Sequence, residues 1–459
     1  MTYFQKLPTD NRGTAQALWS LGGPVAIQSL LTSCMVFLDT LMVSVLGAAA
    51  LGGVGLGTRA LFVITMILVG IASGTSVLVA QYCGAGRSRA IRGPVTAAIG
   101  LGVLVTLPAA LASLFAASTL AGWMSPDPDV AFEAATFLTW SAAYTPLTAI
   151  ALILGATCRS LGNTRSPLWA GLLGLALNAL LNYLFITGRF GLPAFGVGAA
   201  AIATTLARVV EIIWLLCAMK PGSPRWMRGH EAKLVWQTSL PLILKEVFWA
   251  GGIFASTVIV SQMGKISLAA FNLITPIEGI MISSFVGCGV ASGILLGHAL
   301  GRRAFDEAYA TATRLRVLVP RWAMILGGIM AILVQLLRES GWLHALIAPE
   351  IHDLALNSLT VLCIAIGART HNMMVSLGIL RSGNDLTWLL LVDLCSMWLI
   401  NIPLVAFTAL VLQWPLPAVV SVMMLEELLK VFIFRWRVKS GRWMNVIGQE
   451  SRTEKNSTL

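Results

Sequence analysis

Long apolar stretches separated by short polar segments cover almost the whole chain. A helix needs about 20 mainly apolar residues to cross the hydrocarbon core of a bilayer. Twelve runs of this length occur, at residues 18–44, 50–82, 94–122, 130–156, 166–187, 195–218, 235–261, 268–298, 315–337, 353–379, 387–411 and 415–434. Such runs are too long for barrel strands, and in lipid only helices or closed barrels satisfy their backbone groups. The pattern predicts an all-α polytopic membrane protein with 12 transmembrane helices.

Composition and charge agree with this class of protein. The 459 residues are 57% hydrophobic and 11% charged, with a mean hydropathy of +0.82, whereas soluble domains carry about 25% charged residues. The net charge of +11 could suggest a nucleic-acid partner, but the basic residues gather in alternate loops. That alternation follows the positive-inside rule and places both termini in the cytoplasm. We expect a multi-pass protein of the bacterial inner membrane, with the lipid bilayer and no nucleic acid among its partners.

A weak internal repeat divides the chain into two halves. Pro24 and Pro241 open the first and seventh runs at an offset of 217 residues, and Gly47 and Gly264 follow those runs at the same offset. Two halves of six spans each have the same membrane orientation, so the repeat is parallel. We therefore expect two six-helix lobes related by a pseudo-twofold axis, with residues 1–225 as the N-terminal lobe and 226–459 as the C-terminal lobe.

Polar residues inside the first half suggest an ion site. Asp39 is the only charged residue between Arg12 and Arg59, and ionisable groups within spans are functional hypotheses by default. Asn178 and Asn182 lie one turn apart in the fifth span, and Thr204 follows in the sixth. Carboxylate and amide oxygens suit a hard cation such as Na⁺, whereas burial disfavours the charged form of Asp39, which could carry a proton instead. The alternative is that the asparagines only join helix to helix.

The second half carries a different set of ionisable residues within its spans. They are Lys245, Glu246, Glu278, Arg369, His371 and Asp393. Opposite charges in neighbouring helices suggest a buried ion-pair network, which favours a polar cavity but could be purely structural. Glu426, Glu427 and Lys430 are interpreted as interfacial pairs at the end of the twelfth span.

Several stretches resemble the multidrug and toxic compound extrusion (MATE) transporters, in a bacterial NorM-like or DinF-like branch. They include "FLDTLMVSVLGAAALGGVGLGTR", "CRSLGNTRSP", "LNALLNYLFITG" and "GILRSGND". The resemblance implies a secondary active antiporter that exports organic, often cationic or aromatic, compounds in exchange for H⁺ or Na⁺. It assigns the coupling role to Asp39, Asn178, Asn182 and Thr204, the first three as tentative Na⁺ ligands, and matches Glu246 to a second-lobe glutamate.

The sequence differs from the family pattern at some positions, and other functions are possible for it. The tenth-span carboxylate of some NorM-like members aligns near Thr370 and is absent, so Asp393, Glu278 or Arg369 could substitute. The "GNDLT" turn at 383–387 is expected to affect only a cytoplasmic loop. The main alternative function is a flippase for lipid-linked oligosaccharides or another metabolite exporter of the same superfamily. No enzyme motif is present, and we expect no cofactor besides the coupling ion and function as a monomer.

Overall fold

The protein is helical throughout the part of the chain that its structure describes. The computed structural model describes residues 7, 10–186, 188, 195–219, 229–339 and 349–446, and these ranges contain no strand. Eleven helical segments in them are long and apolar enough to cross a membrane. The twelfth span is α14 (Leu416–Lys439), whose hydropathy is reduced by charged residues in its middle. The predicted all-α polytopic fold with 12 transmembrane helices is therefore confirmed.

Contacts divide the chain into two compact units, each described here by itself. Residues 27–246 form the N-terminal unit, and residues 1–26 with 247–459 form the C-terminal unit. The predicted lobe boundary at residue 225 lies in 220–228, outside the described residues, and stays a prediction from the repeat. Both observed divisions fall inside continuous helices, α1 (Asn11–Ser44) and α8 (Gly229–Gln262).

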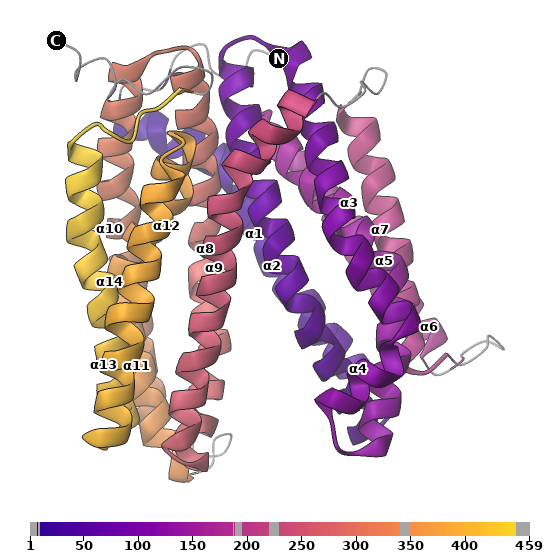
Figure 1. Ribbon diagram of the computed structural model, residues 1–459. Helices are drawn as coiled ribbons and strands as arrows, with labels where there is room; N and C mark the ends of the chain where they lie inside the picture. Colours follow the sequence, from indigo (N-terminus) through magenta and orange to yellow (C-terminus); the bar gives the residue numbers. More distant parts are fainter. Residues whose placement is uncertain are drawn as a thin grey trace. The chain divides into compact units, whose positions relative to one another are not determined.

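The N-terminal unit is a bundle of long helices, drawn in indigo to magenta in Figure 1. It contains most of α1, the start of α8, and the elements α2 (Ala48–Gly84), η1 (Ser88–Ile91), α3 (Arg92–Phe115), α4 (Ala117–Met124), α5 (Pro128–Ser160), α6 (Arg165–Phe185) and α7 (Val197–Met219). Helix α5 packs against α2, α3 and α7, and α6 packs against α7. Helix α5 begins where Asp127 accepts hydrogen bonds from the backbone nitrogens of Asp129 and Val130, at 3.0 and 3.4 Å, with Pro128 in the first turn.

The C-terminal unit has the same kind of architecture with one addition. Besides the start of α1 and the end of α8, it contains α9 (Lys265–Gly301), α10 (Phe305–Glu339), α11 (Pro349–Met373), α12 (Leu386–Cys395), α13 (Ile402–Ala406) and α14. Three π-helical turns interrupt its last helices: η4 (Met374–Leu380), η5 (Ser396–Asn401) and η6 (Phe407–Val411). Helix α11 packs against α9, α10 and α14. π-Helical turns in α-helices occur frequently at functional sites.

The repeat in the sequence has a structural cause at its matching glycines. Gly47 and Gly264 precede α2 and α9 with φ angles of 104° and 100°. A side chain is strained at such angles, so both turns require glycine. The offset of 217 residues therefore marks the same turn in each unit.

The two units also exchange the first part of one helix. Residues 11–26 of α1 belong to the C-terminal unit, and residues 229–246 of α8 belong to the N-terminal unit. In the C-terminal unit, a Cβ added at Gly22 would lie 2.7 Å from the backbone oxygen of Gly287 in α9. In the N-terminal unit, a Cβ added at Gly74 of α2 would lie 2.8 Å from Cα of Ser239 in α8. Small residues thus let backbones approach closely at both crossings.

Candidate functional site

The structure joins Asp39 of α1 to Asn182 of α6. Nδ2 of Asn182 donates a hydrogen bond of 2.7 Å to Oδ1 of Asp39. Asp39 is partly buried, and Asn182 is fully buried. A buried carboxylate is costly unless donors satisfy it, and this bond supplies one of them.

Asn178 and Thr204 extend the same cluster. Asn178 is fully buried, and its Oδ1 accepts a 3.1 Å hydrogen bond from Nδ2 of Asn182, one turn further along α6. Nδ2 of Asn178 lies 3.2 Å from Oγ1 of Thr204 on α7, and that hydroxyl donates to the backbone oxygen of Ala200 over 2.8 Å. The structure therefore brings together the four residues that the sequence singles out in the first half; their role in coupling stays a prediction.

The amide of Asn178 has a second orientation that bonds well. Turning an amide by 180° exchanges its oxygen and nitrogen without moving the other heavy atoms. In the turned orientation, Nδ2 of Asn178 lies 2.8 Å from Oδ1 of Asp39, and its oxygen accepts from the backbone nitrogen and Oγ1 of Thr204, both at 3.2 Å. In that orientation Nδ2 of Asn178 also lies 3.1 Å from Nδ2 of Asn182, where two donors meet, so the Asn182 amide must turn as well.

The possible cation ligands in this cluster are all oxygen atoms. Oδ1 of Asn182 is buried without a hydrogen-bond partner in the described part of the chain. It lies in the same cluster as the Asp39 carboxylate, the Asn178 amide and the Thr204 hydroxyl. Such an oxygen set fits a hard cation or a proton better than a soft metal.

A second cluster lies in the C-terminal unit, where ion pairs link four helices. Arg369 of α11 forms an ion pair with Glu278 of α9, and its Nε lies 3.8 Å from Oε1 of Glu427 in α14. Nζ of Lys430 lies 3.5 Å from Oε1 of Glu427 and 3.9 Å from Oδ1 of Asp393 in α12. The predicted ion-pair network is therefore present for Glu278, Arg369 and Asp393.

Glu426 completes this network and is held by the π-helical turn η5. Its Oε1 lies 2.9 Å from Nζ of Lys430 and accepts a 3.0 Å hydrogen bond from Oγ of Ser396. Its Oε2 accepts a 2.5 Å hydrogen bond from Nδ2 of Asn401. Ser396 and Asn401 are the first and last residues of η5, five positions apart, and a π-helical turn closes at this spacing.

Three residues in this network correct an interpretation made from the sequence. Glu426, Glu427 and Lys430 were expected at the end of the twelfth span as interfacial pairs, but α14 continues to Lys439 and places them in its middle. The apolar run ends at residue 434, before the basic last turn of the helix, and this shortened the predicted span. The three charges within an apolar run were the sequence signal that could have indicated a buried cluster. Nothing in the sequence pointed to Ser396 or Asn401.

The other candidates of the second half have different surroundings. Lys245 and Glu246 form an ion pair of 3.7 Å in the N-terminal unit, rather than in the unit that holds the network. His371 is buried, and its Nδ1 lies 3.2 Å from Oδ1 of Asn372. Nδ2 of Asn372 donates to Oε2 of Glu427 over 2.7 Å. His371 therefore contacts the network through a neighbour rather than directly.

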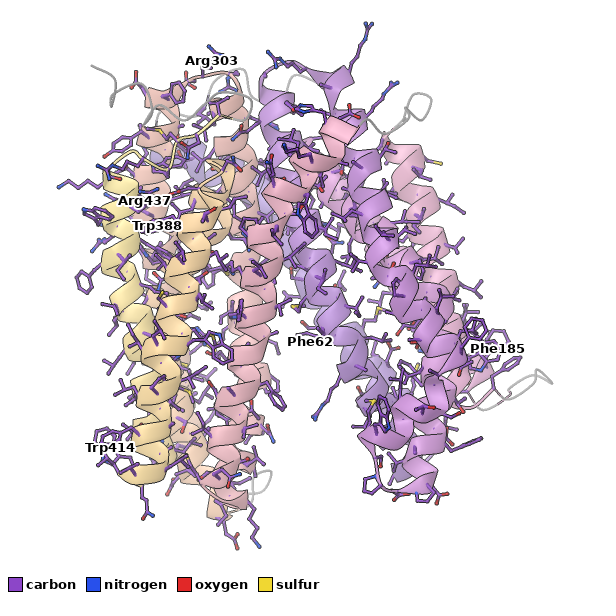
Figure 2. All side chains as sticks on the ribbon, viewed as in Figure 1. Phe62, Phe185, Arg303, Trp388, Trp414 and Arg437 are labelled. Carbon is purple, nitrogen blue, oxygen red and sulfur yellow. The ribbon has the colours of Figure 1, made fainter. Side chains whose placement is uncertain are left out.

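The segment at 383–387, whose last two residues begin α12, makes several contacts with the end of α14. Both carboxylate oxygens of Asp385 bond to Arg437 of α14, at 2.6 Å from Nε and 2.8 Å from Nη2. The guanidinium carbon of Arg437 lies 4.9 Å from the ring centre of Trp388, and Figure 2 labels both residues. The backbone nitrogen of Asn445 donates to the oxygen of Gly383 over 3.1 Å. The loop is thus bound to α14 and the segment after it.

Comparison with known proteins identifies the class of protein that carries these two clusters. The sequence model of the MatE family matches residues 24–184 and 241–407. One matched segment lies in each half of the chain and includes five of that half's six spans, and together the two segments cover more than half of the chain. The protein belongs to the MatE family of membrane transporters.

Individual relatives agree over most of the length. The chain is 23% identical over 441 residues to "Uncharacterized transporter YisQ" of Bacillus subtilis, covering 93% of this chain and 95% of that protein. It is 27% identical over 296 residues to "Multidrug resistance protein NorM" of Burkholderia vietnamiensis, covering 61% and 62%. The solved structure of the Vibrio cholerae MATE transporter VcmN in its bent form has a TM-score of 0.83 at 17% identity, covering 95% of this chain and 99% of that one. At this identity the solved structure supports the shared fold alone.

Proposed function

We propose that this protein is a secondary active multidrug exporter that moves organic, often cationic or aromatic, compounds out of the cell in exchange for H⁺ or Na⁺. The family supports a transporter rather than an enzyme, and the name of the NorM relative supports multidrug export. The single observation that carries the coupling proposal is the partly buried Asp39 carboxylate with Asn182 at 2.7 Å.

A carboxylate in this position is most useful if its charge changes during transport. When Asp39 is ionised, Nδ2 of Asn182 donates to it. When Asp39 holds a proton, turning both amides lets the Asn182 oxygen accept that proton and lets Nδ2 of Asn178 donate to Asn182 over the same 3.1 Å. Every bond in the turned arrangement then has one donor and one acceptor. The cluster therefore supports both charge states of Asp39 without a movement of the helices.

Sodium is the alternative coupling ion at the same cluster. Asp39, Asn178 and Asn182 would hold it through their oxygens, with Thr204 as a further ligand, and the unpaired oxygen of Asn182 fits that role. In either case, ion binding and substrate binding must favour opposite conformations, because a ligand with equal affinity for two states shifts neither.

The charge of the second cluster favours organic cations over the alternative substrate. Glu278, Arg369, Asp393, Glu426, Glu427 and Lys430 contribute four carboxylates against two cations. A flippase for lipid-linked oligosaccharides would bind phosphate groups and would be expected to have an excess of basic residues there. We propose that the protein lies in the bacterial inner membrane. The alternation of basic loops supports a cytoplasmic location for both termini. We also propose a monomer as the functional unit.

Transport in proteoliposomes tests the proposal. A fluorescent organic cation is followed while a pH gradient or a Na⁺ gradient is imposed separately. The proposal expects export driven by at least one gradient, and the active gradient identifies the ion. Movement of the cation that responds to neither gradient would rule out antiport.

A further inference from the structure

The Lys430 ammonium lies among three carboxylates in the C-terminal unit. Its Nζ is 2.9 Å from Oε1 of Glu426, 3.5 Å from Oε1 of Glu427 and 3.9 Å from Oδ1 of Asp393. We propose that these carboxylates form a site for a primary ammonium group, which Lys430 fills as a tethered cation. A soluble substrate bears a protonated primary amine that binds there by taking the place of Lys430.

The anionic side of the site does not depend on Lys430 for its geometry. Ser396 and Asn401 each hold one oxygen of Glu426, at 3.0 and 2.5 Å. Nδ2 of Asn372 holds Glu427 over 2.7 Å. Because these donors come from other helical segments, the carboxylates of Glu426 and Glu427 stay in place when the lysine side chain moves.

An unused acceptor lies beside the carboxylates. Asn401 is 7% exposed, and its Oδ1 has no hydrogen-bond partner in the described part of the chain. Its amide nitrogen donates to Oε2 of Glu426, so the unpartnered oxygen belongs to an amide that already contacts the site. A buried acceptor without a partner is costly, and a ligand with several N–H groups can satisfy it together with the carboxylates.

Lys430 has another partner available when a ligand enters. Glu427 is three residues before it on the same helix, a spacing that brings two side chains together. The lysine ammonium is a compact charge on a flexible four-carbon stem, so it can remain with Glu427 while it leaves Glu426 and Asp393. The ligand ammonium therefore takes the place of the Lys430 ammonium beside Glu426 and Asp393, and no buried charge is left without a partner.

Charge and access also suit a cationic ligand. The network has four carboxylates against the two cations Arg369 and Lys430, which leaves two negative charges when all are ionised. Three side chains of the network are partly exposed, Glu278 and Asp393 at 20% each and Arg369 at 25%. A ligand would approach the carboxylates past these side chains.

The proposal discriminates between types of organic cation. A primary ammonium can donate up to three hydrogen bonds, whereas a quaternary ammonium donates none and holds the carboxylates at a greater distance. This inference rests on the proposed function only in treating the ligand as a transported substrate. Its tests measure ligand binding and need no ion gradient. Failure of gradient-driven export and failure of this inference can therefore be told apart.

A matched pair of fluorescent probes provides the first test. Both carry a dansyl group on the same alkyl chain, and one ends in a primary amine while the other ends in a trimethylammonium. For the unaltered protein in phosphatidylcholine nanodiscs, the primary amine is expected to bind about tenfold more tightly, as one charge-assisted hydrogen bond allows. Glu426→Gln should bring the ratio close to one, and the control Glu307→Gln, at a partly exposed ion pair in the same unit, should leave it unchanged. A ratio near one in the unaltered protein, or a ratio that Glu426→Gln does not change, overturns the proposal.

A second measurement covers the case in which Glu426→Gln does not fold. Lys430→Ala removes the tethered cation, and added n-propylammonium should then raise the melting temperature because it binds the folded state. Tetramethylammonium should not, and a lack of response to n-propylammonium overturns the proposal.

Ethanolamine phospholipids carry the same ammonium group, so probe binding is repeated in nanodiscs that contain them. Unchanged affinity supports a soluble amine as the occupant, and loss of probe binding overturns that assignment in favour of lipid.

Discussion

Nδ2 of Asn182 lies 2.7 Å from Oδ1 of Asp39, although the two residues are 143 positions apart in the chain. This bond joins α1 to α6 inside the N-terminal unit. Its acceptor is the one carboxylate in a long uncharged segment, and its donor is fully buried. The coupling proposal depends on this pair, and the first two predictions test its two members.

Asp39→Asn should strongly reduce gradient-driven export while the protein still folds. The amide has nearly the same shape as the carboxylate, but it cannot exchange a proton or neutralise Na⁺. We expect export in proteoliposomes to fall by about tenfold or more, the effect of losing roughly 1.4 kcal/mol or more of coupling. Asp306→Asn, at an exposed acidic residue in the first turn of α10, is the control and should export normally. Full export by Asp39→Asn would remove Asp39 from the mechanism.

Asn182→Leu should lower the stability of the N-terminal unit. The change removes a donor from Asp39 and from Asn178 and leaves their buried oxygens less satisfied. Such a loss costs about 1–3 kcal/mol, which a thermal unfolding scan of the purified protein detects as a lower melting temperature. Combining it with Asp39→Asn should cost less than the sum of the two single changes, because both act on one bond. Simple additivity would show that the pair does not interact.

Arg437→Lys should be nearly as harmful as Arg437→Gln. The Arg437 guanidinium bonds both oxygens of Asp385 and lies over Trp388, and a lysine reproduces neither the two-bond geometry nor the stacking. Both variants are therefore expected to lower the melting temperature by a similar amount. Lys439→Gln, which changes an exposed basic residue of the same last turn, should change it little. A lysine that restored full stability would mean that charge alone matters at this position.

Gly287→Ala should prevent the close crossing of α9 and α1. The added Cβ would overlap the backbone oxygen of Gly22 and lie 2.9 Å from the nitrogen of Ala26. Backbone atoms cannot move aside without separating the helices, so overpacking should cost at least about 1–3 kcal/mol and reduce the yield of folded protein.

Gly279→Ala is the matched control for that change, because it lies in the same helix with open space around it. Alanine is the better helix former by about 1 kcal/mol, so this variant is expected to be as stable as the unaltered protein or more so. Equal losses for both variants, measured as the fraction of monodisperse protein after size-exclusion chromatography, would contradict the crossing.

The first cluster could be predicted from the sequence because its signals are local. Asp39 is conspicuous within an uncharged segment, and Asn178 and Asn182 have the four-residue spacing that places two side chains on one face of an α-helix. The second cluster could not be predicted fully. Ser396 and Asn401 are five positions apart, which in an α-helix at 100° per residue would place them about 140° apart. Only the π-helical turn brings both to Glu426.

The division of the chain was hidden for a related reason. The predicted spans run through residues 26–27 and 246–247, because each point lies inside one continuous helix. Periodicity marks where a helix begins and ends, but not which neighbours its two parts contact. The spans were therefore predictable, and the exchange of helix starts was not.

That exchange of helix starts limits how the chain can be divided into fragments that fold. A fragment ending at residue 219 would carry residues 11–26 without the helices they pack against, and would lack residues 229–246 that complete its own bundle. The complementary fragment would have the reverse defects. Each half of the duplicated chain is thus an incomplete folding module, and the two could be recovered as separate polypeptides only if they were made together.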